Sequence, residues 1–408
     1  MAWSSLGTLA TGVLGWVTMV VVARLAGPAD FAQFAVVWAI FFGVGGGFAG
    51  LQQEVTRSVT LAEREGVRGR TQLLGPVLAL TVPSVALVAL VVFVDGGALG
   101  VSAGLLALTL GGGLVGLGLL TFGCGVLAAR GKWHLLASVM TADALLRTVA
   151  VVLCLRGDRL DLLPLAIAIG AFAWAPLLLV ASVREVARAR VLDPWTGVMR
   201  RALIAMGSSG CAALLVAGFP LLVSLARPDA LGASVGVVLA TLILVRAPML
   251  VVLYGFRPVI LSGLLSEGLD LWRAVRRWWL ALSALGILAV LLAAVLGPWV
   301  VRTVFGDGYA SSATVLAALT AGSVCLAMLV VSGIALVAAD RHTQSVTGWI
   351  FAVVVTLVVL ALDRSAQQAI LMAVVVGPVA GLAVHGISLS QHSSRRGVQV
   401  GSTGPGRG

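Results

Sequence analysis

Apolar segments, each long enough to cross a bilayer, dominate this 408-residue sequence and leave only short connections between them. A helix needs about 20 mainly apolar residues to span the hydrocarbon core. The segments lie near residues 3–23, 32–51, 73–94, 99–122, 135–155, 162–182, 202–225, 233–256, 279–301, 312–338, 345–362 and 367–388. This pattern predicts an all-α polytopic membrane protein with about 12 transmembrane helices and no room for a soluble domain.

The overall composition excludes two other classes of protein. Hydrophobic residues make up 60% of the chain and charged residues 11%, whereas soluble proteins average about 45–50% and 25%. A soluble multidomain protein of this length is therefore excluded. An intrinsically disordered chain is excluded as well, because disorder requires low hydrophobicity.

The basic residues indicate how the chain is oriented in the membrane. Of the 27 lysines and arginines, 19 fall in the connections after even-numbered segments and in the C-terminal tail, and 6 fall in the other connections. Cytoplasmic loops of membrane proteins carry the excess of basic residues. We therefore expect both termini on the cytoplasmic side of a bacterial plasma membrane.

The formal net charge of +11 has the same explanation. No basic run interleaved with aromatic residues occurs in a polar segment, so nucleic acid is not expected as a partner. Basic loops next to a membrane instead contact anionic lipid headgroups.

Two halves of the sequence resemble each other. Residues 126–132 (VLAARGK) and 336–342 (LVAADRH) occupy equivalent connections, as do residues 61–65 (LAERE) and 265–270 (LSEGLD). Parallel repeats with a binding site at their interface are a transporter architecture. We predict two six-helix lobes related by a pseudo-twofold axis, spanning residues 1–192 and 193–390. Residues 391–408, rich in Gly, Ser and Arg, are predicted to form a flexible cytoplasmic tail.

Three charged residues fall inside apolar segments: Asp143, Arg147 and Arg246. Such groups are costly in a bilayer, and they mark functional sites or structural pairs. Asp143 and Arg147 share a helix face at the i, i+4 spacing. They form either a structural ion pair or a site where an anion displaces Asp143 from Arg147. Arg246 has no acidic neighbour on its own helix, and Pro248 can open the backbone beside it. It either faces a cavity or extends towards the interface.

Arg24 is a further candidate, because it ends the first segment just before Gly27 and Pro28. It lines the outer mouth of a cavity or contacts the membrane interface. The segments thus contain two arginines and one aspartate. That balance favours an anionic substrate, because guanidinium groups bind phosphate oxygens in a bidentate manner.

Signatures of enzymes and cofactors are weak. The glycines before Lys132 do not have phosphate-loop spacing, and Trp133 stands where such a loop has Ser or Thr. The four histidines are isolated, which argues against a metal cluster. The four cysteines lie in apolar segments without paired spacing. We therefore expect no enzyme activity, no metal and no cofactor.

Three motifs resemble those of a known family. Residues 26–34 (AGPADFAQF) are similar to an L-G-P-x-x-F-G-x-F turn, from which Ala26 and Ala32 depart. Residues 302–310 (RTVFGDGYA) resemble an arginine, an apolar pair and F-G-x-x-Y/F. Residues 258–261 (PVIL) resemble a third motif, although the second proline usual there is absent. Together they resemble the bacterial oligosaccharide flippases, or polysaccharide biosynthesis proteins, of the multidrug/oligosaccharidyl-lipid/polysaccharide exporter superfamily.

The resemblance implies two six-helix bundles around a central cavity. It further implies a flippase that moves a polyprenyl-diphosphate-linked glycan from the inner to the outer leaflet by alternating access. Such flippases use cavity arginines, for which Arg24, Arg147 and Arg246 are the candidates here. Glycosyltransferases or a glycan polymerase would be partners. The alternative is a multidrug or small-metabolite exporter of the same superfamily, which would place carboxylates deep in the first lobe, where only Asp143 qualifies.

Overall fold

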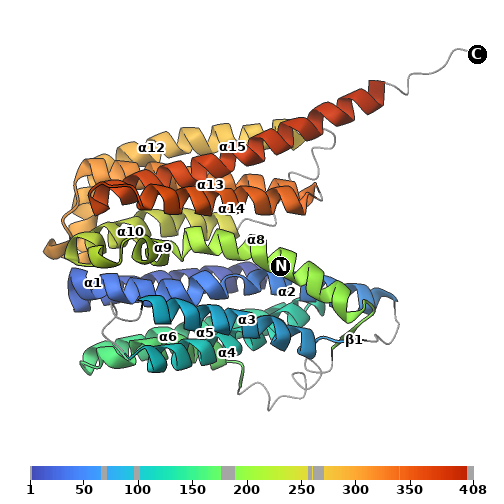
Figure 1. Ribbon diagram of the computed structural model, residues 1–408, viewed down its shortest axis with the longest axis horizontal. Helices are drawn as coiled ribbons and strands as arrows, with labels where there is room; N and C mark the ends of the chain where they lie inside the picture. Colours follow the sequence, from blue (N-terminus) through green and yellow to red (C-terminus); the bar gives the residue numbers. More distant parts are fainter. Residues whose placement is uncertain are drawn as a thin grey trace, which may run out of the picture.

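The computed structural model describes residues 2–65, 71–95, 102–175, 189–255, 260, 271–339 and 341–401, almost all of them helical (Figure 1). The helices of the first half are α1 (Ala2–Gly45), α2 (Phe48–Glu65), α3 (Leu74–Asp95), α4 (Ala103–Ala129), α5 (Trp133–Arg156) and α6 (Leu163–Ile169). Those of the second half are α8 (Trp195–Val216), α9 (Phe219–Ala226), α10 (Ala233–Gly255), α12 (Leu271–Phe305), α13 (Ala313–Ala338), α14 (His342–Leu360) and α15 (Ala366–Gly401).

Ten of these helical stretches are long and apolar enough to cross a membrane. The first, Ser5–Glu65, contains two antiparallel crossings, and the shorter apolar helix Leu160–Phe172 lies where the sixth segment was predicted. The predicted fold class, an all-α polytopic membrane protein, is therefore confirmed. The helices lie in two groups (Figure 1): α1–α6, here called the first group, and α8–α15, here called the second group.

The first two crossings are joined by a hairpin at Gly27. Its φ of 80° and ψ of 171° interrupt the helix, and only glycine adopts such angles without strain. Pro28 then begins the next helical turn, a position where its missing N–H costs no hydrogen bond. The A-G-P motif thus has a local function, because it reverses the chain between two long helices.

The repeat predicted from the sequence has a counterpart in the backbone. The N–H of Lys132 donates to the carbonyl of Leu127, and that of Arg341 donates to the carbonyl of Leu336. These two bonds close the same type of turn, 209 residues apart, after α4 and after α13. The other predicted pair includes residues 265–270, which lie outside the described residues, as does most of the 258–261 motif.

Two predicted connections are helical instead. Residues 52–65 continue as α2, and residues 391–401 of the predicted flexible tail continue as the end of α15 (Figure 1). Gln, Glu and Arg are good helix formers, and a helix that already exists extends at little cost. Hydropathy marks where a helix leaves the bilayer, and it does not mark where the helix ends. Thr71–Gln72 (β1) pairs antiparallel with Arg190–Val191 (β2).

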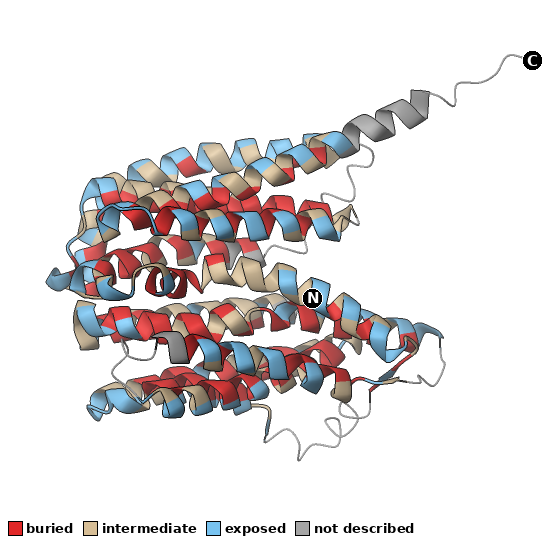
Figure 2. Cartoon of the chain, in the orientation of Figure 1, coloured by how far each residue is buried: buried red, intermediate tan, exposed pale blue. Residues whose placement is uncertain are grey.

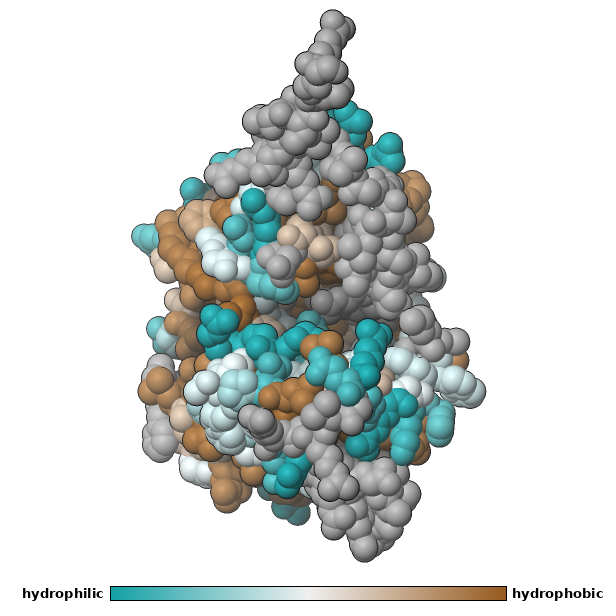
Figure 3. Space-filling view, turned by 90° about the vertical axis from the view of Figure 1, so that its right-hand side faces the viewer, coloured by the Kyte–Doolittle hydropathy of each residue, from teal (hydrophilic) through white to brown (hydrophobic). Residues whose placement is uncertain are grey.

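Buried residues lie on the helix faces that meet other helices, whereas large apolar residues remain exposed on the outer faces (Figure 2). Helix α12 shows this best, because its outward face is exposed along most of its length. Leu280, Leu285, Ile287, Leu291, Val295 and Trp299 are all more than half exposed. Apolar surface of this extent indicates contact with lipid. Hydrophilic residues gather at one end of the bundle (Figure 3).

Candidate functional site

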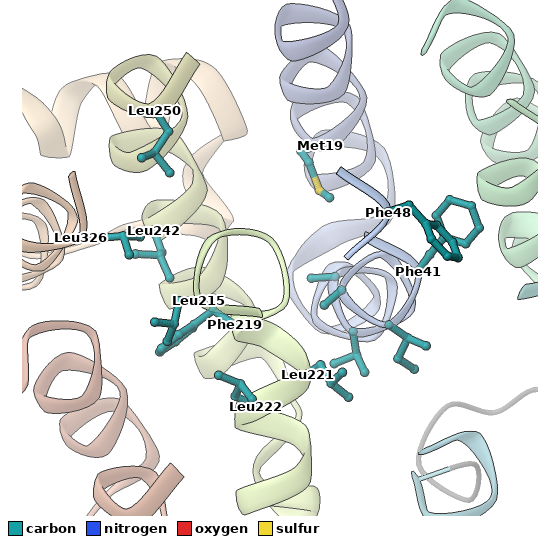
Figure 4. Close-up of a cluster of buried hydrophobic side chains, with 14 of the residues drawn as sticks. Met19, Phe41, Phe48, Leu215, Phe219, Leu221, Leu222, Leu242, Leu250 and Leu326 are labelled. Carbon is teal, nitrogen blue, oxygen red and sulfur yellow. The ribbon is translucent and has the colours of Figure 1, made fainter. Parts of the chain in front are cut away.

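A cavity of about 620 Å³ lies between the two groups of helices. Residues of α1 and α5 form one wall, and residues of α8, α9 and α10 form the other. The lining residues are Thr8, Thr11, Gly12, Gly15, Trp16, Met19, Ala35, Trp38, Met140, Val216, Ala217, Phe219, Pro220, Leu239, Leu242, Ile243, Arg246, Ala247 and Leu250. Figure 4 shows Met19 of α1 and Leu242 and Leu250 of α10 on these facing helices. We call this space the central cavity.

Among the described residues that line the central cavity, Arg246 is the one that carries a charge. Its Nη1 donates to the carbonyl oxygen of Leu215 at 2.7 Å, and its guanidinium lies 5.5 Å from the centre of the Phe219 ring. Helix α8 ends at Val216, so its last carbonyls have no partner within the helix. The arginine satisfies one of them and complements the negative end of the helix dipole.

Arg246 retains hydrogen-bonding capacity for a ligand. The residue is 5% exposed, and its buried Nε has no hydrogen-bond partner in the described part of the protein. The lining residues that the structure describes include no acidic side chain. A buried cation with a free donor on an apolar wall is suited to an anionic group, because charge-assisted hydrogen bonds are strongest away from water.

Asp143 and Arg147 form a buried ion pair inside the first group. The guanidinium of Arg147 lies 4.6 Å from the ring centre of Phe42 and 5.4 Å from that of Phe41. Neither charged residue is among those that line the central cavity. The i, i+4 pairing expected from the sequence is present. Met140 lines the cavity from nearly the same face of α5, but the guanidinium of Arg147 packs against Phe41 and Phe42 of α1, inside the first group.

Arg24 lies near the tip of the hairpin and is exposed. It is not among the residues that line the central cavity, so the structure brings only Arg246 of the four candidates to the cavity wall.

The two groups touch beside the hairpin tip, at what we call the Tyr309 end. The hydroxyl of Tyr309 donates to the carbonyl oxygen of Ala23 at 2.8 Å, and its ring meets Phe31 edge-on. Burial, together with the nearby Asp30, raises the pKa of Tyr309 well above its usual value, so its hydroxyl remains a donor. Gly236 of α10 lies directly against the carbonyl of Pro28, where a side chain would collide. The motif residues around 28, 31 and 309 thus close the cavity at this end.

The groups also touch at the opposite end, which we call the Glu54 end. Glu54 of α2 is 6% exposed and accepts hydrogen bonds from Arg57 at 2.9 Å, Ser58 at 2.9 Å and Arg201 of α8 at 2.8 Å. Arg201 also pairs with Asp193 at 2.6 Å. This network joins the first group to the second group and to the segment before α8.

Glu54 is not among the site residues predicted from the sequence, because it lies in a segment interpreted as a polar connection. One signal was available. Glu54, Arg57 and Ser58 have the i, i+3 and i, i+4 spacing of a single helix face. The partner on α8, 147 residues away, follows from no local pattern.

We predict that Glu54→Gln loosens the contact at the Glu54 end. Glutamine keeps the size of the side chain but removes the charge that three donors share. Hydrogen bonds to a charged group are worth about 1.5–3 kcal/mol, and the partial exposure of Arg201 puts the loss at about 1–2 kcal/mol. The population of molecules in which α2 and α8 are separated at the Glu54 end should rise roughly 5- to 30-fold. Distances between spin labels at Leu61 of α2 and Arg200 of α8 measure it.

Glu63→Gln is the matched control. Glu63 lies on the same helix and pairs with Arg130 at 2.9 Å, inside the first group. It should leave the α2–α8 distance distribution as in the parent protein. A similar shift in both variants would contradict a specific role for Glu54, as would no shift in Glu54→Gln.

Sequence comparison finds relatives over nearly the whole chain. The chain is 32% identical over 397 residues to the uncharacterized protein Mb3654 of Mycobacterium bovis, covering 94% of this chain and 90% of the relative. It is 33% identical over 381 residues to the uncharacterized protein Rv1510 of Mycobacterium tuberculosis, covering 90% and 86%. No protein-family model matches the sequence.

Solved structures show the same fold at low sequence identity. The lipid II flippase MurJ in an inward closed conformation aligns with a TM-score of 0.69 and 12% identity, over 96% of this chain and 88% of that chain. An outward-facing multidrug resistance MATE transporter of the MOP superfamily aligns with a TM-score of 0.67 and 14% identity, over 97% and 95%. The chain therefore belongs to the same family as the two mycobacterial proteins, and it has the fold of the MOP-superfamily transporters.

Proposed function

We propose that this protein is a flippase that moves a polyprenyl-diphosphate-linked oligosaccharide across the bacterial plasma membrane, from the inner to the outer leaflet. The observation that carries the proposal is Arg246, a buried arginine whose Nε has no partner among the described residues. It is the one charged residue among the described residues that line the central cavity, which is largely apolar. A diphosphate is an anion with several acceptor oxygens, which a guanidinium binds well. The polyprenyl chain would remain in the bilayer.

The proposed transport proceeds by alternating access. The contacts at the Tyr309 end and at the Glu54 end lie on either side of the cavity. Each can separate while the other holds, so that the groups rock about the substrate. We assign the Glu54 end to the cytoplasm, in keeping with the excess of basic residues there. Outward movement of negative charge is favoured by an inside-negative potential, about 2.3 kcal/mol per charge per 100 mV.

The alternative is a multidrug or small-metabolite exporter, since MATE transporters share the fold. Binding of a cationic drug calls for carboxylates on the cavity wall, and the residues that line the central cavity include none. Asp143, the acidic residue that the exporter hypothesis would use, is already paired with Arg147. The chemistry of the lining therefore favours an anionic substrate over a cationic drug.

Reconstitution distinguishes the two functions. Purified protein in liposomes should move polyprenyl-diphosphate-linked N-acetylglucosamine at least 10-fold faster than protein-free liposomes, followed by the access of a membrane-impermeant oxidant to the sugar. The same liposomes should not accumulate ethidium. Ethidium transport without lipid translocation would overturn the proposal in favour of the exporter.

A further inference from the structure

A second cavity, of about 320 Å³, adjoins the central cavity. The two share Val216 and Ala217 at the end of α8. Phe42 of the second cavity packs at a tilt against Trp38 of the first, with ring centres 4.5 Å apart. The walls of the second cavity come from both groups, through α1 and α2 on one side and α8, α13 and α14 on the other. Its volume lies within the range of small-ligand sites.

The second cavity differs from the first in its chemistry. Within the described parts of the chain, none of its lining residues is charged, and three of them, Ser208, Ser209 and Ser345, carry hydroxyls. Trp349 and Phe42 provide aromatic surface. Hydroxyl donors and acceptors next to an indole ring suit an uncharged, polyhydroxylated group, whose hydroxyls form hydrogen bonds and whose C–H face packs on the aromatic ring.

Ser345 provides an independent sign of a ligand. The residue is 1% exposed, yet its hydroxyl has no hydrogen-bond partner in the described part of the protein. Other buried hydroxyls in these helices donate to the preceding turn, as Ser323 does to Leu319 and Thr356 to Ala352. Ser345 lines the second cavity, and its buried hydroxyl has no partner among the described residues, a state that is rare for buried polar groups.

The surroundings of Ser345 hold it in place. His385 donates through Nε2 to the carbonyl oxygen of Ser345 at 3.0 Å, and its Nδ1 lies 2.9 Å from the hydroxyl of Ser332. The ring of His385 also meets Trp349 edge-on. The backbone of Ser345 and the indole of Trp349 therefore contact the same histidine, as is typical of a preorganised binding wall.

We propose that the second cavity is a sugar subsite, in which Ser345 and Trp349 bind the first saccharide unit while Arg246 holds the diphosphate in the central cavity. This assignment rests on the proposed function and makes it more specific. The juxtaposition of an uncharged hydroxyl-lined cavity and a cationic one selects substrates that carry an anionic group and a neutral sugar side by side.

The test compares two lipids on the protein in nanodiscs: polyprenyl diphosphate, and the same lipid carrying N-acetylglucosamine. The parent protein should bind the glycosylated lipid more tightly. Loss of one neutral hydrogen bond corresponds to about 3- to 10-fold in affinity. In Ser345→Ala the ratio of the dissociation constant of the bare lipid to that of the glycosylated lipid should fall by that factor. In Ser209→Leu, which fills part of the cavity, it should fall at least as far.

Thr347→Ala is the matched control, because Thr347 lies on the exposed face of the same helix and its hydroxyl donates to the carbonyl of Thr343. Its ratio should equal that of the parent. Equal affinity of the parent protein for both lipids would overturn the subsite and leave the proposed flippase intact. An equal loss for both lipids in Ser209→Leu would assign the cavity to the polyprenyl chain instead. Failure of the parent to bind or move either lipid would overturn the proposed function as well.

Discussion

Arg246→Ala is expected to reduce lipid translocation by about 30- to 150-fold while leaving the protein folded in the membrane. The variant removes the one charge among the described residues that line the central cavity, an arginine whose Nε has no partner in the described part of the protein. Charge-assisted hydrogen bonds contribute about 2–3 kcal/mol, and each 1.4 kcal/mol corresponds to a factor of ten. Translocation of polyprenyl-diphosphate-linked N-acetylglucosamine in liposomes, normalised to the reconstituted protein, measures the effect.

Two companion variants show whether the effect belongs to the cavity arginine. Arg246→Lys keeps the charge but loses the planar fork that binds two phosphate oxygens, so it should retain partial activity. Arg24→Ala removes an exposed arginine away from the cavity lining and should translocate at the parental rate. Parental activity in Arg246→Ala would refute the assignment of Arg246 to substrate binding. So would an equal loss in Arg24→Ala.

The second large effect is on stability. Asp143→Ala is expected to lower the free energy of unfolding by about 3–5 kcal/mol, because it leaves the guanidinium of Arg147 buried without a counter-charge. The side chain of Arg147 is 3% exposed and packs on Phe41 and Phe42. Breaking a buried pair costs much more than replacing both partners by apolar groups of similar volume. Thermal unfolding in detergent measures the difference.

The double variant Asp143→Leu/Arg147→Met is the decisive partner of this experiment. Its free energy of unfolding should lie within about 1–2 kcal/mol of that of the parent, because the variant has no charge left to bury at these positions. It should also translocate lipid, because neither residue lines the central cavity. A stable double variant without transport would show that Asp143 and Arg147 act in transport, and it would contradict their purely structural role.

Local sequence signals single out charged residues within the apolar segments but not the direction in which each side chain points. The apolar segments single out Arg246 and Arg147 equally, because both are costly in a bilayer. The i, i+4 rule correctly pairs Asp143 with Arg147. Which helix face turns towards the other group depends on packing across helices, so the sequence could not separate a cavity arginine from an arginine in the interior of one group.

Contacts between distant parts of the chain could not be predicted from the sequence, for the same reason. Glu54 binds Arg201, and Tyr309 binds Ala23 across 286 residues. The family-like motifs marked residues 26–34 and 302–310 as notable, but only the folded chain brings Phe31 and Tyr309 together. Ser345 carried no signal at all, since a serine with a free hydroxyl is indistinguishable in sequence from one that bonds to its own helix.

The sequence by itself determined that this chain is a bundle of membrane-crossing helices, with a chain reversal at Gly27. That follows because the bilayer forces each apolar segment to satisfy its own backbone hydrogen bonds, which is a local requirement. The sequence also marked the few charged residues inside the apolar segments as candidates for a function or a structural pair. The tertiary structure alone decided that Arg246 faces the central cavity, that Arg147 does not, and that Ser345 lies on a second cavity. Cavities are what remains between helices after they pack, and packing depends on residues far apart in the chain.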